Sequence, residues 1–191
     1  IQELNILKKN HSELHDSFYK NLEFGTGGMR GIMGVGTNRI NKYTIGKNTQ
    51  GISNFINNQH NISKKVVIAF DCRKNSDILA KVVADVFSAN GIKVYLFSSL
   101  RPTPQLSYAV RKLNCTCGIV LTASHNPPKY NGFKVYWSDG GQIVPPIDKK
   151  LISEIEKIQF EDVKFNGNNS LIEIIEQEFD NEFINLCLTT G

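Results

Sequence analysis

Apolar positions along this chain of 191 residues fall into two alternating patterns. Three short runs are almost continuously apolar and rich in β-branched residues, as is typical of strands buried on both faces of a sheet: residues 65–70, 92–97 and 118–121. Between these runs, residues 78–89 and 105–113 carry apolar side chains at helical spacing. This β-α-β-α-β order predicts a parallel sheet with helices on both of its faces.

Further elements flank this unit on both sides. Helical spacing predicts four more helices, at residues 4–18, 43–56, 146–158 and 171–188. Ser76 and Ser170 stand where a serine side chain would cap a helix start. Residues 133–137 predict a strand, and residues 142–144 are expected to pair back on it after a Gly-Gly turn. We therefore expect an α/β fold, a three-layer α/β/α sandwich with a mainly parallel, partly mixed sheet, spanning residues 1–191 as a single domain.

Composition and charge narrow the class of protein. Hydrophobic residues make up 40% and charged residues 21% of the chain, which is typical of a globular rather than a disordered protein. The net charge is +4, but no basic run concentrates it, so we expect no nucleic-acid partner. No apolar stretch approaches the length of a membrane span, so we expect no membrane partner. The four cysteines lack metal-binding spacing, which favours reduced thiols in a cytoplasmic protein.

Polar loops are predicted at the carboxyl ends of the three central strands, where open α/β sheets bind ligands. These loops are residues 71–76, 98–104 and 122–130. In the third, Ser124 precedes two prolines that prevent the loop from continuing as a helix, so its hydroxyl is expected to be held outward in a fixed position. The loop lacks the G-x-S-x-G sequence and an evident His-Asp pair, which argues against a serine hydrolase.

Five short motifs occur in one order along the chain. They are Phe24-Gly-Thr-Gly-Gly-Met-Arg-Gly31, Asp71-x-Arg73-x-x-Ser76, Pro102-Thr103-Pro104, Thr122-Ala-Ser-His-Asn-Pro-Pro128 and Tyr130-Asn-Gly-Phe-Lys134. Together they resemble the first domain of the α-D-phosphohexomutases, the family of phosphoglucomutase and phosphomannomutase. The serine loop followed by Asn-Gly-Phe-Lys is the most specific part of this resemblance. It implies that the chain is the N-terminal domain I of a longer four-domain enzyme, with the remaining domains as its partners.

The resemblance also implies a reaction. The family's serine, here Ser124, carries a phosphoryl group and gives it to a hexose monophosphate such as glucose or mannose phosphate. A bound bisphosphate forms, and the other phosphate returns to the serine, so that phosphate moves between the 1- and 6-positions. Arg30 and Lys134 are expected beside the phosphoserine, where they stabilise charge and take part in proton transfer. His125 is expected to orient the substrate or to relay protons.

The same resemblance assigns supporting roles. Thr26, Gly27 and Asn126 are expected to bind the substrate or its phosphate. Asp71 and Arg73 are expected to form an ion pair that supports the serine loop.

The family's Mg²⁺ binds the phosphoserine and three aspartates of an Asp-x-Asp-x-Asp motif, which this sequence lacks. Ser124, through its phosphate, is therefore the one metal ligand expected here, and one oxygen is a poor Mg²⁺ site by itself. We expect the isolated chain to be inactive. The long glycine-rich motif resembles the phosphoglucomutase and phosphopentomutase branch. Phosphopentomutase and phosphoglucosamine mutase remain alternatives, as does a non-catalytic binding module with the same fold.

Overall fold

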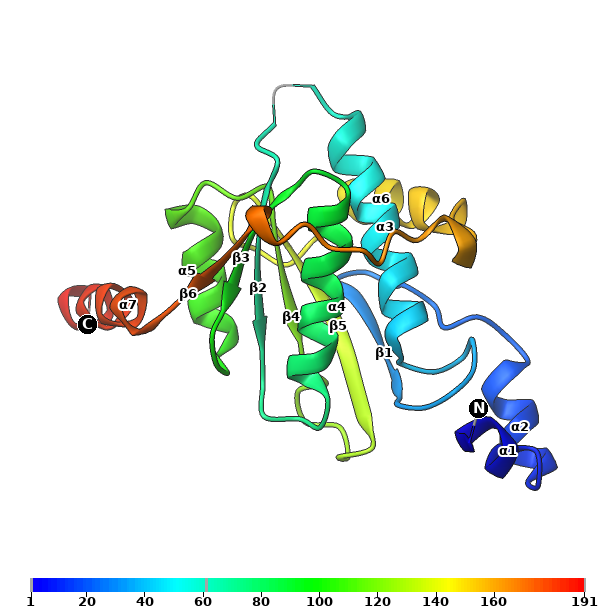
Figure 1. Cartoon of the computed structure of the whole chain (residues 1–191). Helices are drawn as coiled ribbons and strands as arrows, with labels where there is room; N and C mark the ends of the chain where they lie inside the picture. The colour runs from blue at the N-terminus through cyan, green and yellow to red at the C-terminus, as the bar shows by residue number, and fades with distance from the viewer. Residues whose placement is uncertain (1, 61, 191) are drawn as a thin grey trace.

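A six-stranded sheet forms the middle layer of the molecule (Figure 1). The computed structural model describes residues 2–60 and 62–190. The strands are β1 (Gly28–Ile32), β2 (Lys65–Phe70), β3 (Lys93–Phe97), β4 (Cys117–Leu121), β5 (Tyr130–Trp137) and β6 (Ile172–Ile175). They lie in the order β1-β5-β4-β2-β3-β6. Strands β4, β2, β3 and β6 pair in parallel, whereas β5 is antiparallel to both of its neighbours, so the sheet is mainly parallel and partly mixed, as predicted.

Helices cover both faces of this sheet, which confirms the three-layer α/β/α architecture. The helices are α1 (Gln2–Leu7), α2 (His11–Phe18), α3 (Lys42–Asn58), α4 (Ser76–Ala89), α5 (Thr103–Lys112), α6 (Ile147–Glu156) and α7 (Gln177–Thr190), with 3-10 turns at Phe160–Asp162 and Asn169–Leu171. One apolar cluster joins Ile52 of α3 and Val83 of α4 to Ile68 of β2. A second cluster joins Leu106 of α5 to Val67 of β2 on the opposite face. This alternation of buried residues along β2 explains its continuous apolar run.

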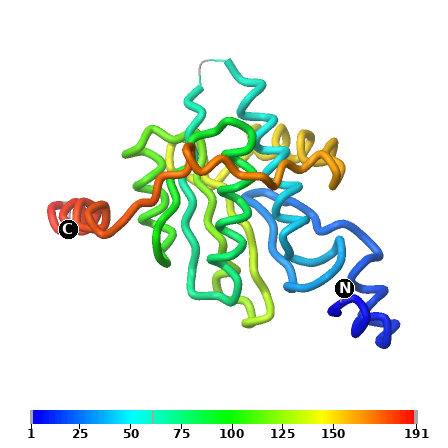
Figure 2. The backbone as a smooth tube through the Cα atoms, viewed as in Figure 1, coloured from blue at the N-terminus to red at the C-terminus, as the bar shows by residue number. Residues whose placement is uncertain are grey.

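The two ends of the chain lie at opposite edges of the sheet (Figure 2). Helices α1 and α2 lie on the side of β1, and α7 packs beside α5 through rings of Tyr108 and Phe179, 5.5 Å apart. The predicted single helix over residues 4–18 is wrong, because α1 ends at Leu7 and α2 begins at His11. Asn10 starts the second helix by accepting a hydrogen bond from the Glu13 N–H at 3.2 Å.

At the two edges of the sheet, strands form where the sequence predicts a turn and the start of a helix. The glycine-rich segment predicts turns, but residues 28–32 pair with β5 as β1. The last helix is predicted from residue 171, but residues 172–175 pair in parallel with β3 as β6. A short β-branched run fits a strand or a helix by periodicity alone, and here pairing with β3 decides the outcome.

The predicted serine caps are also wrong. Ser170 donates to Asn168, and Asn75 rather than Ser76 takes the cap position of α4. Asn75 adopts a left-handed conformation, with φ of 63°, so the chain turns sharply into the helix before Ser76. Ser76 is thereby the first residue of α4, and its side chain is directed to a partner outside the helix.

Gly28 lets β1 lie close against β5. Its φ is 132°, and a Cβ atom at this position would overlap the carbonyl oxygen of Phe133. Gly91 has φ of 75° but open space around it. We therefore predict that Gly28→Ala lowers the free energy of unfolding by about 3 kcal/mol or more, and that Gly91→Ala lowers it by about 1 kcal/mol, from backbone strain alone. Denaturant unfolding of both variants measures the difference, and equal losses would contradict the proposed close approach.

Candidate active site

The candidate site lies at the carboxyl ends of the central strands β2 and β4, at the bottom of the view in Figure 1. We call this side of the sheet, formed by strand ends, the ligand-binding edge. The backbone N–H of Asp71, which follows β2, donates to the carbonyl of Leu121, the last residue of β4, at 3.1 Å. The two loops that follow these strands, residues 71–75 and 122–129, therefore start side by side. This is the edge at which open α/β sheets bind ligands.

Ser124 has an uncommon backbone conformation. Its φ angle is 56°, in the left-handed region, and the residue is exposed. Such a conformation costs a non-glycine residue about 1–3 kcal/mol, so it persists only where surrounding contacts hold it. One of these contacts comes from Thr122, whose hydroxyl accepts a hydrogen bond from the Ser124 N–H at 3.0 Å. Since Thr122 is itself buried, its hydroxyl is a rigid anchor for the serine backbone.

The guanidinium group of Arg73 holds the same loop from the side of β2. Its Nη2 atom donates to the carbonyl oxygens of Ser124 and Asn126, at 2.8 and 2.7 Å. Its Nη1 atom donates to those of Pro127 and Tyr130, at 3.1 and 3.0 Å. The Arg73 side chain is only 12% exposed, whereas the loop residues Ser124 and Pro127 that it binds are exposed. A planar fork of N–H donors can reach four carbonyls at once, which an ammonium group cannot do.

Asp71 holds Arg73 in turn. Its Oδ1 atom accepts a hydrogen bond from the backbone N–H of Arg73 at 3.0 Å, and its Oδ2 atom lies 3.6 Å from Arg73 Nε. The structure thus brings the Asp-x-Arg pair and Ser124 together.

Arg30 reaches the serine loop from β1. Its Nη1 atom donates to Asn126 Oδ1 at 2.7 Å. The Asn126 side chain, expected to bind substrate, therefore holds Arg30 in this structure. Arg30 also lies opposite Gly132 of β5, and the N–H of Thr122 donates to the Gly132 carbonyl at 3.1 Å. A Cβ atom on Gly132 would lie 2.5 Å from the carbonyl oxygen of Thr122, so glycine allows these strands to approach closely.

Lys134 lies on β5 two residues beyond Gly132, the partner of Arg30, and so on the same face of the sheet as Arg30. It is paired with Gly28 of β1 and Val120 of β4, and paired residues of neighbouring strands share a face. Lys134 is partly exposed. Within residues 2–60 and 62–190, no hydrogen bond or ion pair joins Lys134 to the loop of Ser124. The structure therefore places Lys134 on the site's face but leaves its amino group uncommitted to the loop.

His125 is exposed beside the serine. Its Nδ1 atom lies 3.4 Å from Ser124 Oγ, at the long end of hydrogen-bond distances. In the part of the chain that the structure describes, no carboxylate forms an ion pair with this imidazole. The His-Asp pair of a serine hydrolase is therefore not assembled around Ser124.

Thr26 and Gly27 lie in the turn before β1. The Thr26 hydroxyl donates to Asp148 Oδ2 of α6 at 3.0 Å. Gly27 has φ of 86°, and its carbonyl accepts from the N–H of Val135 at 3.0 Å and from Gln142 Nε2 at 3.1 Å. These contacts fix the glycine turn to β5 and α6 rather than to the loop of Ser124.

Three residues that support the site are missing from the sequence-based assignment: Thr122, Ser76 and Asn131. Thr122 lies within the serine motif, two residues before Ser124, which is the spacing of a hydroxyl that binds a later backbone N–H. Ser76 has the sequence signature of a helix cap, and Asn131-Gly132 that of a turn. Local sequence patterns therefore conceal the long-range contacts of both residues.

Cations surround this edge of the sheet. Besides Arg30, Arg73 and Lys134, the loops carry the exposed residues Lys74 and Lys129. Such a concentration of positive charge favours a phosphorylated ligand. Among the described residues, no group of three or more His, Cys, Asp or Glu side chains could hold a metal ion, and no helix is long and apolar enough to cross a membrane.

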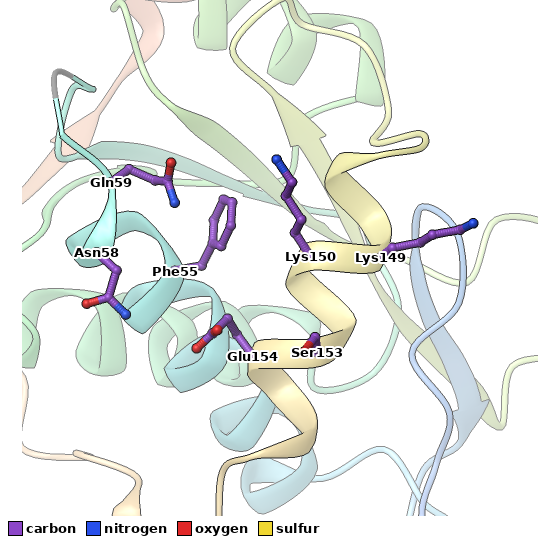
Figure 3. A pocket seen from close by; sticks show the side chains of 7 residues that line it. All are labelled: Phe55, Asn58, Gln59, Lys149, Lys150, Ser153 and Glu154. Atoms are coloured by element: carbon purple, nitrogen blue, oxygen red, sulfur yellow. The ribbon is translucent and has the colours of Figure 1, made fainter.

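A cavity of about 340 Å³ lies elsewhere, between the end of α3 and α6 (Figure 3). Its lining includes Phe55, whose ring lies 5.9 Å from that of Trp137, the last residue of β5. Trp137 pairs with Cys117, the first residue of β4, whereas Ser124 follows the other end of that strand. This cavity therefore lies near the opposite end of β4 from Ser124 and does not contribute to the site.

Comparisons with known proteins agree with this fold. The family model described as phosphoglucomutase/phosphomannomutase, alpha/beta/alpha domain I, matches residues 21–162. The phosphoglucomutase of Staphylococcus aureus (strain USA300) is 44% identical over 146 residues, which are 76% of this chain and 26% of that protein. The phosphopentomutase of Pongo abelii is 41% identical over 160 residues, 80% of this chain and 26% of that protein.

A crystal structure of a putative phosphomannomutase from Thermus thermophilus has the same fold. Its TM-score is 0.69 at 28% identity, over 82% of this chain and 33% of that one. The chain thus spans about a quarter of the length of the two mutases named above (26% of each). Because the family model covers well over half of the chain, and the serine loop and its cations lie at one edge of the matching fold, the chain belongs to the phosphoglucomutase/phosphomannomutase family of α-D-phosphohexomutases and contains their α/β/α domain I.

Proposed function

We propose that this chain is the phosphoserine domain of a phosphosugar mutase. The complete protein would move a phosphoryl group between the 1- and 6-positions of a hexose phosphate, with glucose or mannose phosphate as the substrate. The observation that carries the proposal is the placement of Ser124. Its backbone is held in a left-handed conformation, and its exposed side chain lies among cations at the ligand-binding edge of the sheet. Family membership and the S. aureus phosphoglucomutase support it.

In the proposed reaction, Ser124 carries a phosphoryl group before the sugar binds. A free hydroxyl oxygen of the sugar monophosphate attacks this phosphorus, the bond from phosphorus to Ser124 Oγ breaks, and a sugar bisphosphate forms. The proton of the sugar hydroxyl passes to Ser124 Oγ, with Lys134 and His125 as the candidate carriers. The second phosphate then returns to Ser124 by the reverse steps. Arg30 stabilises the charge on the transferring group, since this chemistry depends mainly on positioning and charge.

Mg²⁺ would bind the phosphate on Ser124 and neutralise charge on the transferring group. Mg²⁺ prefers six oxygen ligands, so one phosphate oxygen is not a sufficient site. We propose that the remaining ligands and the sugar-binding groups come from parts of the complete protein outside this chain. Purified by itself, the 191-residue chain should therefore show no measurable turnover. Turnover by this chain alone would contradict a requirement for other parts.

The direct assay of the proposed function uses the complete protein. With Mg²⁺ and a trace of glucose 1,6-bisphosphate, we expect conversion of glucose 1-phosphate to glucose 6-phosphate. If the protein converts neither glucose 1-phosphate nor mannose 1-phosphate, the hexose assignment is rejected.

Phosphopentomutase is the second candidate activity, because the 41% identical relative from Pongo abelii carries that name. The ratio of kcat/KM for glucose 1-phosphate to that for ribose 1-phosphate, measured on one preparation, decides between the two. No finding favours phosphoglucosamine mutase. A non-catalytic binding module would bind sugar phosphates without ever carrying a phosphoryl group on Ser124.

Arg30 provides a test of charge stabilisation. Arg30→Ala should lower kcat by about 10²-fold, because it removes a cation that the Asn126 side chain holds beside the serine loop. Arg111→Ala is the matched control, since Arg111 is an exposed arginine in the last turn of α5. Steady-state kinetics on both variants give the comparison, and equal kcat values would contradict the role of Arg30.

A further inference from the structure

A buried chain of hydrogen bonds leads from the sheet to the loop of Ser124. It begins at Asn131 on β5 and passes through Ser76 at the start of α4, and both residues are fully buried. Asn131 Nδ2 donates to Ser76 Oγ at 3.0 Å, and Ser76 Oγ donates to Asp71 Oδ1 at 3.0 Å. Asp71 accepts the backbone N–H of Arg73 with the same oxygen. The chain therefore ends at the residue that holds the serine loop.

The direction of this chain is fixed by chemistry. An amide NH₂ group only donates and a carboxylate only accepts, so the Ser76 hydroxyl between them must give its single proton to Asp71. Asn131 has one orientation as well, because its Oδ1 accepts the N–H of Gly132 at 2.8 Å while its Nδ2 also donates to the Lys74 carbonyl at 3.3 Å. Each bond in such a chain polarises the next.

The chain connects elements that are distant in sequence but converge on the site. Asn131 lies opposite Gly31 of β1, and Asp71 and Arg73 follow β2. A shift of the Asp71 carboxylate would move Arg73, because Arg73 is held at both its backbone N–H and its Nε. Arg73 binds the carbonyl of Ser124, whose left-handed conformation depends on outside contacts.

We propose that Ser76 and Asn131 are positioning residues for phosphoryl transfer. They orient Asp71, Asp71 orients Arg73, and Arg73 holds the hydroxyl of Ser124 in line for reaction. Neither residue touches the substrate. This inference rests on the proposed function of Ser124, and it adds two residues to the site that lie beneath its surface.

The test compares Ser76→Ala with Ser53→Ala in the complete protein. Ser53 is also fully buried in a helix, and its hydroxyl donates to the Thr49 carbonyl at 2.7 Å. Both variants therefore remove one buried hydroxyl group, but only Ser76→Ala removes the two hydrogen bonds that join Asn131 to Asp71. Misplacing a reacting group lowers rate without lowering ground-state affinity, so we expect Ser76→Ala to lower kcat about 10-fold with KM unchanged. Ser53→Ala should match the wild type in both constants, on whichever sugar phosphate the wild type converts.

A double-mutant cycle tests whether the two residues act through one chain. The loss of kcat in Ser76→Ala/Asn131→Ala should be no greater than in the more impaired single variant, whereas independent roles give multiplied losses. Multiplied losses, or a kcat for Ser76→Ala equal to that of Ser53→Ala, would overturn the inference. If Asn131→Ala does not fold, the comparison of Ser76→Ala with Ser53→Ala alone tests the inference. An inactive wild type whose Ser124 never carries phosphate would reject the proposed function instead.

Discussion

Ser124→Ala is expected to abolish mutase turnover by the complete protein, with kcat lowered by at least about 10⁴-fold. The variant has no oxygen to carry the phosphoryl group between the two half-reactions, and neither His125 nor Lys134 can replace it in the same position. Steady-state kinetics and intact-mass analysis on the same preparation check the result. The variant should also lose the mass of one phosphoryl group. Residual turnover near the wild-type value would exclude Ser124 as the carrier.

Ser138→Ala is the control for this substitution, since Ser138 is an exposed serine in the turn after β5, at the end of the strands opposite to Ser124. It should leave turnover unchanged. A third variant separates loss of function from loss of fold. Ser124→Gly should unfold with a free energy about 0.5–1 kcal/mol above that of Ser124→Ala, because glycine adopts a φ of 56° without strain, partly offset by its greater freedom when unfolded. Both variants should be equally inactive.

Arg73→Lys is expected to have the second largest effect. Lysine keeps the charge but cannot donate to four carbonyl oxygens at once, so most of the support for the serine loop is lost. We expect the free energy of unfolding to fall by about 3 kcal/mol, because the loop loses most of four hydrogen bonds to a charged donor. We also expect kcat to fall by about 10²-fold, because the Ser124 hydroxyl leaves its reactive position.

Arg39→Lys is a matched control for stability. The Arg39 side chain is 7% exposed, and its guanidinium group binds the carboxylate of Asp16 at 2.6 Å and the carbonyls of Asp16 and Asn38 at 3.3 and 3.0 Å. The variant should lose a similar free energy of unfolding while keeping the wild-type kcat. An equal loss of kcat in both variants would show that general destabilisation, not the position of Ser124, explains the effect of Arg73→Lys.

The parallel core of the fold was predictable because β2 and β4 are buried on both faces. Their apolar runs leave few other interpretations, and helical spacing in α4 and α5 separates them. The serine loop was predictable for a related reason, since a polar segment after a buried strand must lie at the ligand-binding edge. Arg73 could be assigned to the loop through its motif, but its four carbonyl partners could not be counted from sequence.

Edge strands were the main failure, because pairing and not local pattern determines them. β1 contains Gly28 and Gly31, which signal turns, yet glycine is what lets it approach β5 and fit beneath the side chain of Leu22. β6 is too short to distinguish from the start of a helix. The roles of Ser76 and Asn131 were missed for a similar reason. Their local sequence is typical of a helix cap and of a turn, but their side chains form long-range hydrogen bonds instead.

The most direct test is to locate the phosphoryl group. The complete protein is incubated with glucose 1,6-bisphosphate, digested and sequenced by tandem mass spectrometry, before and after addition of excess glucose 1-phosphate. We predict one phosphoryl group on Ser124, within the peptide that spans residues 113–129, and that addition of the monophosphate makes it exchange with the sugar pool. Turnover with the phosphoryl group on another residue, or with Ser124 unmodified throughout, would contradict the assignment of Ser124 as the phosphoryl carrier.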